Sequence, residues 1–329
     1  MLVISREDIL RVFSMRDAIE SDKRAFVMQA RGQCDSPLRA SFDIEKGGGQ
    51  SLFMPAHVRG LDATGVKIVS VFTGNPAKGK PAVPATMILL DDECGEIQSI
   101  MDGTTLTQMR TGALSGAATE LLARPDASVA ALFGTGGQAA YQLLAMLTVR
   151  PFKEVRVFDV DEKRRAAFVA AQGPVAEGFG ARLVAARSPT EAVEGADVIT
   201  TVTTSADPVF SARSVRAGAH VNSIGSYTPK MREMESDLLV KARVVYADNK
   251  AAVLAEAGDF TQPIAAGIFG PERIDGELGE LIDGKKPGRR GPQDITVFKS
   301  VGFAALDVVA AQTIYAKARA AGIGRDIDI

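Results

Sequence analysis

One glycine-rich turn has the residue types and the spacing that bind phosphate groups. Residues 134–139 read Gly-Thr-Gly-Gly-Gln-Ala, follow the apolar run 129–133 and precede a segment with helical spacing. Gly134 permits a tight turn, Gly136 lets the backbone approach a pyrophosphate, and Ala139 allows close packing of helix against strand. The start of the helix also presents N–H groups and a partial positive charge to an anion. We therefore expect the turn to hold a dinucleotide, through Gly134, Thr135, Gly136, Gly137, Gln138 and Ala139.

An acidic residue follows this turn at the distance expected for a ribose contact. Asp159 lies about twenty residues past Ala139, at the end of the next apolar run. Its carboxylate would accept hydrogen bonds from the adenosine ribose and repel a 2′-phosphate, which favours NAD, with NADP as the alternative. The competing interpretation is a glycine-rich turn in some other α/β protein. Thr203, Thr204 and Ser205 follow the apolar run 197–202 and are expected to line the nicotinamide side of the crevice.

Three basic residues in the N-terminal third suggest a site for a small anion. Lys67 lies inside the apolar run 65–69, Arg110 begins a stretch of small residues, and Arg39 precedes an extended segment. A buried lysine is costly unless it is paired, so the alternative is that Lys67 points to solvent from an edge strand and Arg39 is solvated. Two arginines and a lysine suit the carboxylate of a small amino acid. Lys67 is also the candidate for proton transfer, if neighbouring cations lower its pKa.

The elements that must position these residues change character near residue 123. Before it the pattern is α+β, with a capping box at Ser14, extended segments at 51–56, 65–72 and 86–90, a turn at Cys94-Gly95 and a helix over 106–122. From residue 128 short apolar strands alternate with helices, which predicts a Rossmann-type, doubly wound parallel sheet. A last helix over 304–321 is expected to pack back on the N-terminal part. We predict a dinucleotide-binding domain over 123–302 and a second, α+β domain built from 1–122 and 303–329.

Composition excludes several other classes of protein. The net charge is −2 and the pI is about 5.9, which gives no case for nucleic acid or an anionic membrane as a partner. Two cysteines and two histidines at scattered positions are too few for a disulfide scaffold or a zinc site, so we expect no metal. No run approaches the roughly 18 to 20 apolar residues of a membrane span. The cysteine usage fits a reducing cytoplasm.

Several stretches of the sequence, taken together, resemble the ornithine cyclodeaminase/μ-crystallin family over nearly the whole chain. The resemblance implies a homodimer, a Rossmann domain, and a substrate and dimerisation domain formed by both chain ends. It also implies that Arg39, Lys67 and Arg110 hold the substrate carboxylate, and that Thr86 lies near the nicotinamide. Arg110, Thr111 and Ser226 are further expected cofactor contacts. The matching stretches are Gly65-Val66-Lys67, Asn75-Pro76, Met101-Asp102-Gly103, 106–113, 134–139, Gly225-Ser226-Tyr227-Thr228-Pro229, 276–280 and 296–302.

One departure from the family pattern shapes the functional hypothesis. Cyclodeaminases carry an aspartate just after the glycine that corresponds to Gly225, whereas this chain has Ser226 and no acid until Glu233. The resemblance therefore favours an NAD(P)H-dependent reductase of a small cyclic imino acid such as Δ1-pyrroline-2-carboxylate, giving proline. An alanine-type amino-acid dehydrogenase and an ornithine cyclodeaminase are the enzymatic alternatives. A nucleotide- or small-ligand-binding protein of the μ-crystallin kind is the non-enzymatic one.

Overall fold

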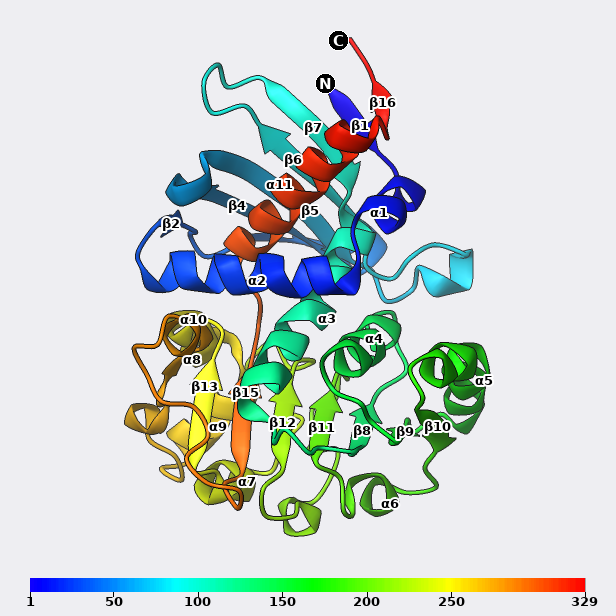
Figure 1. Cartoon of the computed structure of the whole chain (residues 1–329), viewed down its shortest axis with the longest axis vertical. Helices are drawn as coiled ribbons and strands as arrows, with labels where there is room; N and C mark the ends of the chain where they lie inside the picture. Colours follow the sequence, from blue (N-terminus) through cyan, green and yellow to red (C-terminus); the bar gives the residue numbers. More distant parts are fainter. Residues whose placement is uncertain (329) are drawn as a thin grey trace. The chain divides into compact units, whose positions relative to one another are not determined.

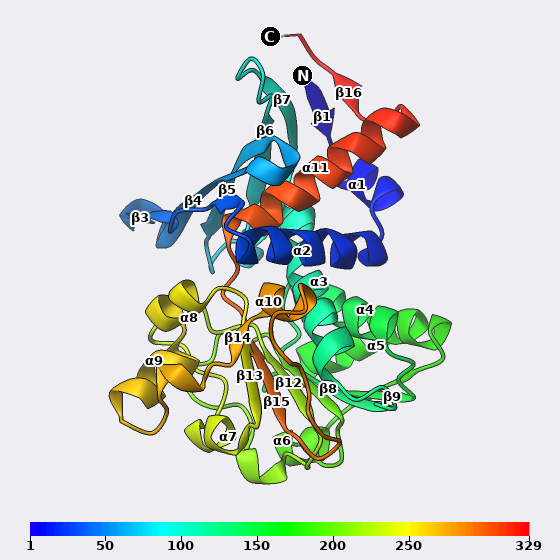
Figure 2. The same ribbon diagram turned by 60° about the vertical axis from the view of Figure 1, so that its left-hand side comes forward.

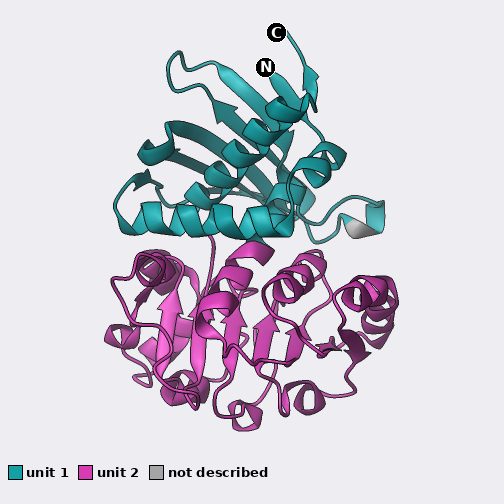
Figure 3. Cartoon of the chain, viewed as in Figure 1, with its two compact units in different colours: residues 1–111, 303–329 teal, residues 112–302 magenta. Residues whose placement is uncertain are grey.

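The computed structural model describes residues 1–328, apart from the side chain of Pro76, and these form two compact units. Unit 1 combines both chain ends, Met1–Thr111 and the segment from Phe303 onward, and unit 2 is Gly112–Gly302 (Figure 3). The division falls inside helix α3 (Gly103–Leu122), earlier than the boundary expected after residue 122. None of the helices among the described residues is long and apolar enough to cross a membrane.

Unit 1 contains a mixed sheet in which strands from the two chain ends, β16 (Arg325–Asp326) and β1 (Leu2–Ile4), lie side by side at one edge. β1 pairs in parallel with β7 (Ile97–Asp102) and antiparallel with β16. The other neighbours are antiparallel, and β3 (Ala40–Ile44) pairs with β4 (Gly49–Val58). The three extended segments predicted from the sequence are confirmed as β4, β5 and β6. The strand order is β16 (Arg325–Asp326), β1 (Leu2–Ile4), β7 (Ile97–Asp102), β6 (Ala85–Leu90), β5 (Ala63–Val71), β4 (Gly49–Val58) and β2 (Cys34–Asp35).

One long helix packs on this sheet, and a second packs on that helix. α2 (Met15–Ala30) begins at the predicted capping box, where Ser14 and Asp17 exchange hydrogen bonds, and α1 (Arg6–Val12) precedes it. α11 (Ala304–Ala321) ends at Gly322, which has the positive φ that glycine tolerates. α11 packs against α2, β4 and β5, as Figures 1 and 2 show. This confirms that the last helix returns to the N-terminal part, and it brings residues about 240 positions apart into contact.

Unit 2 is the predicted doubly wound parallel sheet (Figure 1). The strand order reverses beside β8 (Val129–Phe133). β9 (Glu154–Phe158) and β10 (Arg182–Ala185) lie on one side of β8, and the later strands lie on the other. Ligands of such sheets bind at this reversal, beyond the carboxyl ends of the strands. The order is β10 (Arg182–Ala185), β9 (Glu154–Phe158), β8 (Val129–Phe133), β11 (Val198–Thr201), β12 (His220–Ser223), β15 (Thr296–Lys299), β13 (Val244–Ala247) and β14 (Gly276–Glu277).

Apolar side chains alternate along β8 and so supply both faces of this sheet. Ala130 and Leu132 pack with α4 (Ala139–Val149) and α5 (Glu162–Gly178), whereas Ala131 and Phe133 join the core on the opposite face. Alternation between two buried faces explains why the strands read as continuous apolar runs. The opposite face is covered by α6 (Pro189–Val193), α7 (Ser236–Lys241), α8 (Lys250–Glu256) and α9 (Gly258–Ala265), and α10 (Leu278–Ile282) follows β14.

The sequence pattern missed the shortest elements. It predicted no helix between residues 225 and 295, where the structure has α7 to α10. These helices are five to eight residues long, too short to show a helical repeat, and tertiary packing stabilises them. Strands β1 and β16 were also missed, because three and two residues are too few to show the alternation of a strand.

Candidate active site

The turn after β8 has the backbone geometry that a dinucleotide requires. Gly134 adopts a φ of +96°, and a Cβ there would lie 2.8 Å from the carbonyl oxygen of Val202, so only glycine fits. A Cβ on Gly136 would meet no atom closer than the Arg164 guanidinium, 4.0 Å away, which leaves room above the backbone. Ala139 is fully buried at the start of α4. The turn therefore fits the pyrophosphate of a dinucleotide, which would lie over Gly136 at the start of α4.

A cleft of about 550 Å³ opens beside this turn, within unit 2. It is lined by seven of the residues predicted to bind the cofactor: Gly134, Thr135, Gly136, Asp159, Thr203, Thr204 and Ser205. The Asp159 carboxylate accepts hydrogen bonds from the backbone N–H and hydroxyl of Thr135, at 2.8 and 2.7 Å. Burial opposes ionisation, but these bonds, one from Asp161 N–H and the charge of Arg164 lower the pKa of Asp159. Asp159 is thus held as an anion at the cleft, as ribose recognition requires.

The other predicted cofactor residues lie outside the lining of this cleft. Gly137 is exposed, and Gln138 precedes α4 without a side-chain cap. Ser226 is fully buried, and its hydroxyl donates to the carbonyl of Met231 at 2.8 Å. In unit 1, Thr86 is exposed on β6 and Thr111 is buried in α3. Their contacts with a cofactor stay predictions.

Within unit 1, Lys67 and Arg110 converge on one carboxylate that the sequence analysis did not single out. The Lys67 ammonium lies 2.7 Å from Oδ2 of Asp307, and Nε of Arg110 lies 2.8 Å from Oδ1. Lys67 is 1% exposed and Asp307 is 0% exposed. The question of whether Lys67 faces solvent is therefore answered: it lies on the inner face of a central strand and is paired.

Burial and the neighbouring charges bring the pKa of Lys67 close to neutral pH. Burial and the charge of Arg110 lower the pKa of Lys67 to about 7, although Asp307 opposes this, and Arg39 lowers it further. Burial would raise the pKa of Asp307, but Arg110 and Lys67 hold it below its usual value. Arg39, which is partly exposed, thus acts electrostatically on Lys67. The structure brings Lys67 and Arg110 together on Asp307, while the contact of Arg39 with a substrate stays a prediction, and Lys67 is able to gain or lose a proton near pH 7.

A second carboxyl group, Asp22 on α2, lies buried near this cluster. Neither of its oxygens has a hydrogen-bond partner in the structure. Burial raises the pKa of Asp22 well above its usual value, against the charge of Arg110 and with the help of Asp307. Burial therefore favours the neutral form of Asp22, whereas Lys67 and Arg110 pair with Asp307.

We predict that Asp22→Asn stabilises the protein, and more so as the pH rises. Unfolded aspartate ionises above about pH 4, whereas burial raises the pKa of folded Asp22 well above its usual value, so the wild type loses stability as the pH rises above about 4. The advantage of the variant should grow by about 1 kcal/mol or more between pH 5 and pH 8. Denaturant unfolding at both pH values measures it. Glu20→Gln, at an exposed position of the same helix, is the control, and an equal gain at both pH values would contradict the assignment.

Sequence reasoning missed Asp307 and Asp22 because each resembles an ordinary helical residue. The available signal was an acid on the apolar face of a helix: Asp307 lies among Leu306, Val308 and Val309, where a charge needs a partner. That signal marks Asp307 as paired, but it does not identify Lys67 and Arg110 as the partners.

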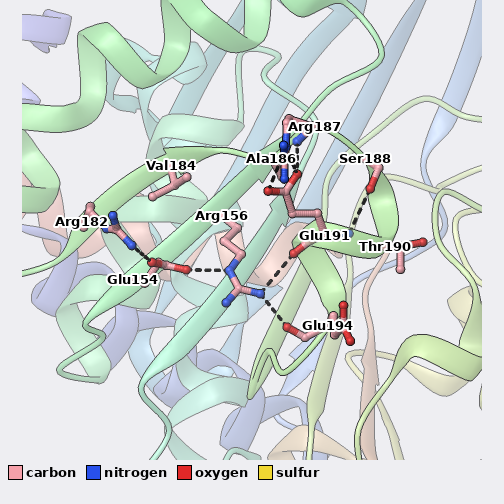
Figure 4. A pocket seen from close by; sticks show the side chains of 10 residues that line it. All are labelled: Glu154, Arg156, Arg182, Val184, Ala186, Arg187, Ser188, Thr190, Glu191 and Glu194. Carbon is pink, nitrogen blue, oxygen red and sulfur yellow. Dashed lines mark hydrogen bonds and ion pairs between the residues drawn. The ribbon is translucent and has the colours of Figure 1, made fainter.

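A larger hollow, of about 880 Å³, lies elsewhere in unit 2, along β9, β10 and α6 (Figure 4). Its charged groups satisfy one another: Glu154 pairs with Arg156 and Arg182, and Arg187 pairs with Glu191. Arg156 also donates to the main-chain carbonyls of residues 191 and 194. None of the predicted site residues lines this hollow, and we assign no chemistry to it.

Comparison with known proteins identifies the family of the chain. Residues 1–322 match the model of the ornithine cyclodeaminase/mu-crystallin family. The chain is 37% identical over 328 residues to Δ1-pyrroline-2-carboxylate reductase of Bacillus cereus, covering 100% of both chains. The structure of Δ1-pyrroline-2-carboxylate reductase of Thermococcus litoralis in complex with NADH and L-proline superposes with a TM-score of 0.94, at 37% identity, covering 99% of this chain and 100% of that one.

A dimeric archaeal alanine dehydrogenase with bound NAD has a TM-score of 0.91 and 34% identity, covering 100% of this chain and 99% of that one. Both similarities extend over both units and over all the stretches that the sequence analysis compared with this family. The chain belongs to the ornithine cyclodeaminase/mu-crystallin family.

Proposed function

We propose that this protein is an NAD(H)-dependent oxidoreductase that reduces a small cyclic imino acid, of the Δ1-pyrroline-2-carboxylate type, to proline or a similar amino acid. The observation that carries the proposal is the buried Lys67, paired with Asp307 and with a pKa of about 7. The relatives that carry the names pyrroline-2-carboxylate reductase and alanine dehydrogenase support the reaction class, and structures with NADH or NAD support the cofactor.

The charge of the unit 1 cluster suits a carboxylate substrate. Lys67 and Arg110 pair with the ionised Asp307, Arg39 acts electrostatically on Lys67, and burial favours the neutral form of Asp22. The excess positive charge lies in a buried environment, where it attracts an anion more strongly than it would in water. Arg39 and Arg110 would bind the substrate carboxylate and so orient the imine.

Reduction of the C=N bond adds two electrons and a proton to carbon and a second proton to nitrogen. The dinucleotide supplies the hydride when it is bound and leaves oxidised. Lys67 in its ammonium form supplies the proton to the imine nitrogen, and it is recharged from solvent after the amino acid leaves. A group with a pKa near 7 suits this role, because it holds a proton at neutral pH and releases it without a large cost.

The loop after β12 favours imine reduction over cyclodeamination. The residue after Gly225 is Ser226, whose hydroxyl is bonded to a main-chain carbonyl. The nearest acid, Glu233, is fully buried and accepts hydrogen bonds from the backbone of the same loop. A carboxylate used in this way does not offer the contact to a second substrate amine that the cyclodeaminase pattern requires.

A substrate panel tests the proposal. The purified protein is assayed with NADH and NADPH against Δ1-pyrroline-2-carboxylate, Δ1-piperideine-2-carboxylate and pyruvate with ammonia, and separately with ornithine and NAD. We expect the highest kcat/KM with a cyclic imine and NADH. Preference for pyruvate and ammonia would establish an alanine dehydrogenase, which the similarity to the archaeal enzyme makes the second candidate. Proline formation from ornithine, or NADH binding without any turnover, would also overturn the proposal.

We propose further that two copies of this chain form a homodimer through strand β3. All five residues of β3 are exposed, and Phe42 and Ile44 present apolar side chains on one face, with the Phe53 ring 5.7 Å from that of Phe42. Adjacent exposed apolar side chains of this kind mark interfaces. The dimeric state of the archaeal relative supports a second copy as the partner.

Phe42→Glu should therefore convert the dimer to a monomer. A charge buried at the interface costs several kcal/mol, which is enough to raise the dissociation constant at least about a thousandfold. Light scattering coupled to gel filtration reports the mass. Phe179→Glu, at a comparably exposed aromatic residue of unit 2, is the matched control and should leave the mass unchanged. Loss of the dimer in the control alone would place the interface elsewhere.

The two cysteines support the expected reducing compartment. Cys34 and Cys94 are both free thiols, and burial raises the pKa of Cys34 to about 11. A thiol with such a high pKa carries little thiolate at neutral pH and reacts slowly. We propose the cytoplasm as the site of action.

A further inference from the structure

We propose that Glu233 is a positioning residue for the nicotinamide half of the dinucleotide site. It ties together the two loops that follow β11 and β12, and it makes no contribution to the adenosine half. This inference rests on the proposed dinucleotide site in unit 2, and it goes beyond the chemistry proposed for the enzyme.

The Glu233 carboxylate joins two loops by main-chain hydrogen bonds. Its Oε1 accepts from the backbone N–H of Thr203 at 2.6 Å and from the Thr203 hydroxyl at 2.8 Å. Its Oε2 accepts from the N–H of Gly225 at 2.7 Å and from the N–H of Ser226 at 3.2 Å. Thr203 follows β11 and Gly225 follows β12, so one side chain fixes the separation of two loop starts.

Close approach of the loops explains why this position needs such a bridge. A Cβ on Gly225 would lie 2.0 Å from the carbonyl oxygen of Thr203 and 2.6 Å from Oε1 of Glu233. The two loops are therefore in contact through main-chain atoms, and their N–H groups point at the same buried carboxylate. Without an acceptor there, several buried donors would lose their partners, and the loops would move apart to reach water.

A second buried layer holds Glu233 in place. Asp259 accepts from the N–H of Glu233 at 2.7 Å and from that of Met234 at 2.9 Å. Lys299 donates to Asp259 at 3.0 Å and to Ser223 at 3.2 Å, and Ser223 donates to Asp259 at 2.8 Å. Glu233, Asp259, Lys299 and Ser223 are all fully buried or nearly so. The network thus connects the two loops to strands β12 and β15, which are central in the sheet.

The hydrogen-bond pattern favours an ionised Glu233. Five donors lie within hydrogen-bond distance of its two oxygens, the fifth being the Ser223 hydroxyl at 3.5 Å, and a protonated carboxyl group would present a further donor among them. Burial raises the pKa of Glu233 and Asp259 adds to this effect, while Lys299 and the bonds from Thr203 oppose it. The lysine is therefore what makes a second buried carboxylate tolerable beside Asp259.

The topology restricts this effect to one half of the cofactor. The sheet order reverses between β9 and β11, on either side of β8, and dinucleotides lie across this point. Asp159 follows β9 and lies at the adenosine end, whereas Thr203, Thr204 and Ser205 follow β11 and line the other part of the same cleft. The Glu233 carboxylate bonds to the β11 and β12 loops and to no residue of the β9 loop among the described contacts, so its loss should disturb nicotinamide binding and spare adenosine binding.

Binding of two ligands to the same variants tests the inference. The ligands are NADH and ADP-ribose, which lacks the nicotinamide, and the affinities are measured by calorimetry without substrate. Glu233→Gln should raise the Kd for NADH about tenfold or more and leave the Kd for ADP-ribose within about twofold. Glu233→Asp, which keeps the charge, should recover part of the loss. Asp159→Ala is the matched variant and should weaken both ligands by similar factors.

Equal weakening of both ligands by Glu233→Gln, or no weakening of either, would overturn the inference. If that variant does not fold, Ser223→Ala replaces it. Ser223 lies outside the cleft lining, donates a hydrogen bond to Asp259 and accepts one from Lys299. Its loss for NADH should be smaller, about threefold, and again absent for ADP-ribose. These readouts need no turnover, so failure of the imine assay and failure of this inference are distinguishable. NADH that does not bind the wild type would refute the proposed dinucleotide site itself.

Discussion

Replacing Lys67 with methionine should lower kcat/KM for the cyclic imine by about a hundredfold to ten-thousandfold and leave NADH binding unchanged. The methionine fills a similar volume, but it carries no proton and no charge. Loss of a positioned general acid has this range of effects, and loss of one of three cations around the substrate carboxylate adds to it. Because Lys67 lies in unit 1 and the dinucleotide cleft in unit 2, the two readouts separate catalysis from cofactor affinity.

Steady-state kinetics and NADH titration of the same preparation check this result. Lys317→Met is a suitable control, since Lys317 lies on the same helix as Asp307 and forms an exposed pair with Asp17. That variant should keep its activity, because an exposed pair contributes about 1 kcal/mol at most. Full activity of Lys67→Met would remove the lysine from the mechanism and leave the arginines as a carboxylate site only.

Asp307→Asn is expected to destabilise the protein by about 3–5 kcal/mol and to shift its pH profile. Asp307 is the only ionised carboxylate among the described residues that pairs with Lys67 or Arg110, so its neutralisation leaves two buried cations uncompensated. The loss should be larger at pH 6 than at pH 9, because Lys67 can deprotonate at the higher pH and remove one of the two charges. Denaturant unfolding at both pH values measures this difference. Asp326→Asn, in an exposed pair with Arg319, is the control.

The same variant tests which group controls the rate. In the wild type, reduction requires protonated Lys67, so kcat/KM should fall as the pH rises through about 7. The oxidative direction requires the neutral amine and should rise over the same interval. Asp307 favours the charged form of Lys67. Asp307→Asn should therefore move both pH profiles, the falling one for reduction and the rising one for oxidation, to lower pH, and Asp307→Glu should restore them. If the pH at which kcat/KM changes stays the same in Asp307→Asn, the change would belong to the ionisation of the substrate or of another group.

Local sequence signals predicted the parts of the fold whose physics is local. The glycine turn at 134–139 needs a positive φ at Gly134 and open space over Gly136, and residue types report both directly. The alternation of apolar runs and helices reports a sheet covered on both faces, so the parallel sheet and its order of elements followed. The capping box at Ser14 is equally local, because its two hydrogen bonds lie within four residues.

Long-range contacts decided what the sequence left open. The pattern of strand β5 allows Lys67 to face either side, and its burial depends on Asp307, 240 residues later. The five- to eight-residue helices α7 to α10 have no repeat to detect and exist because they pack on the sheet. Glu233 was noted only as the next acid after Ser226, and its role appears when the loops after β11 and β12 meet at its carboxylate.

The amino-acid sequence by itself therefore determined the family, the dinucleotide turn and the three basic residues expected to face a small acid. Only the tertiary structure decided which carboxylates accompany those cations, which acid has a raised pKa and which lysine has a pKa near 7. The physical reason is that residue type and spacing fix backbone geometry within a few positions, whereas the pKa of a buried group depends on desolvation and on charges brought together by the fold.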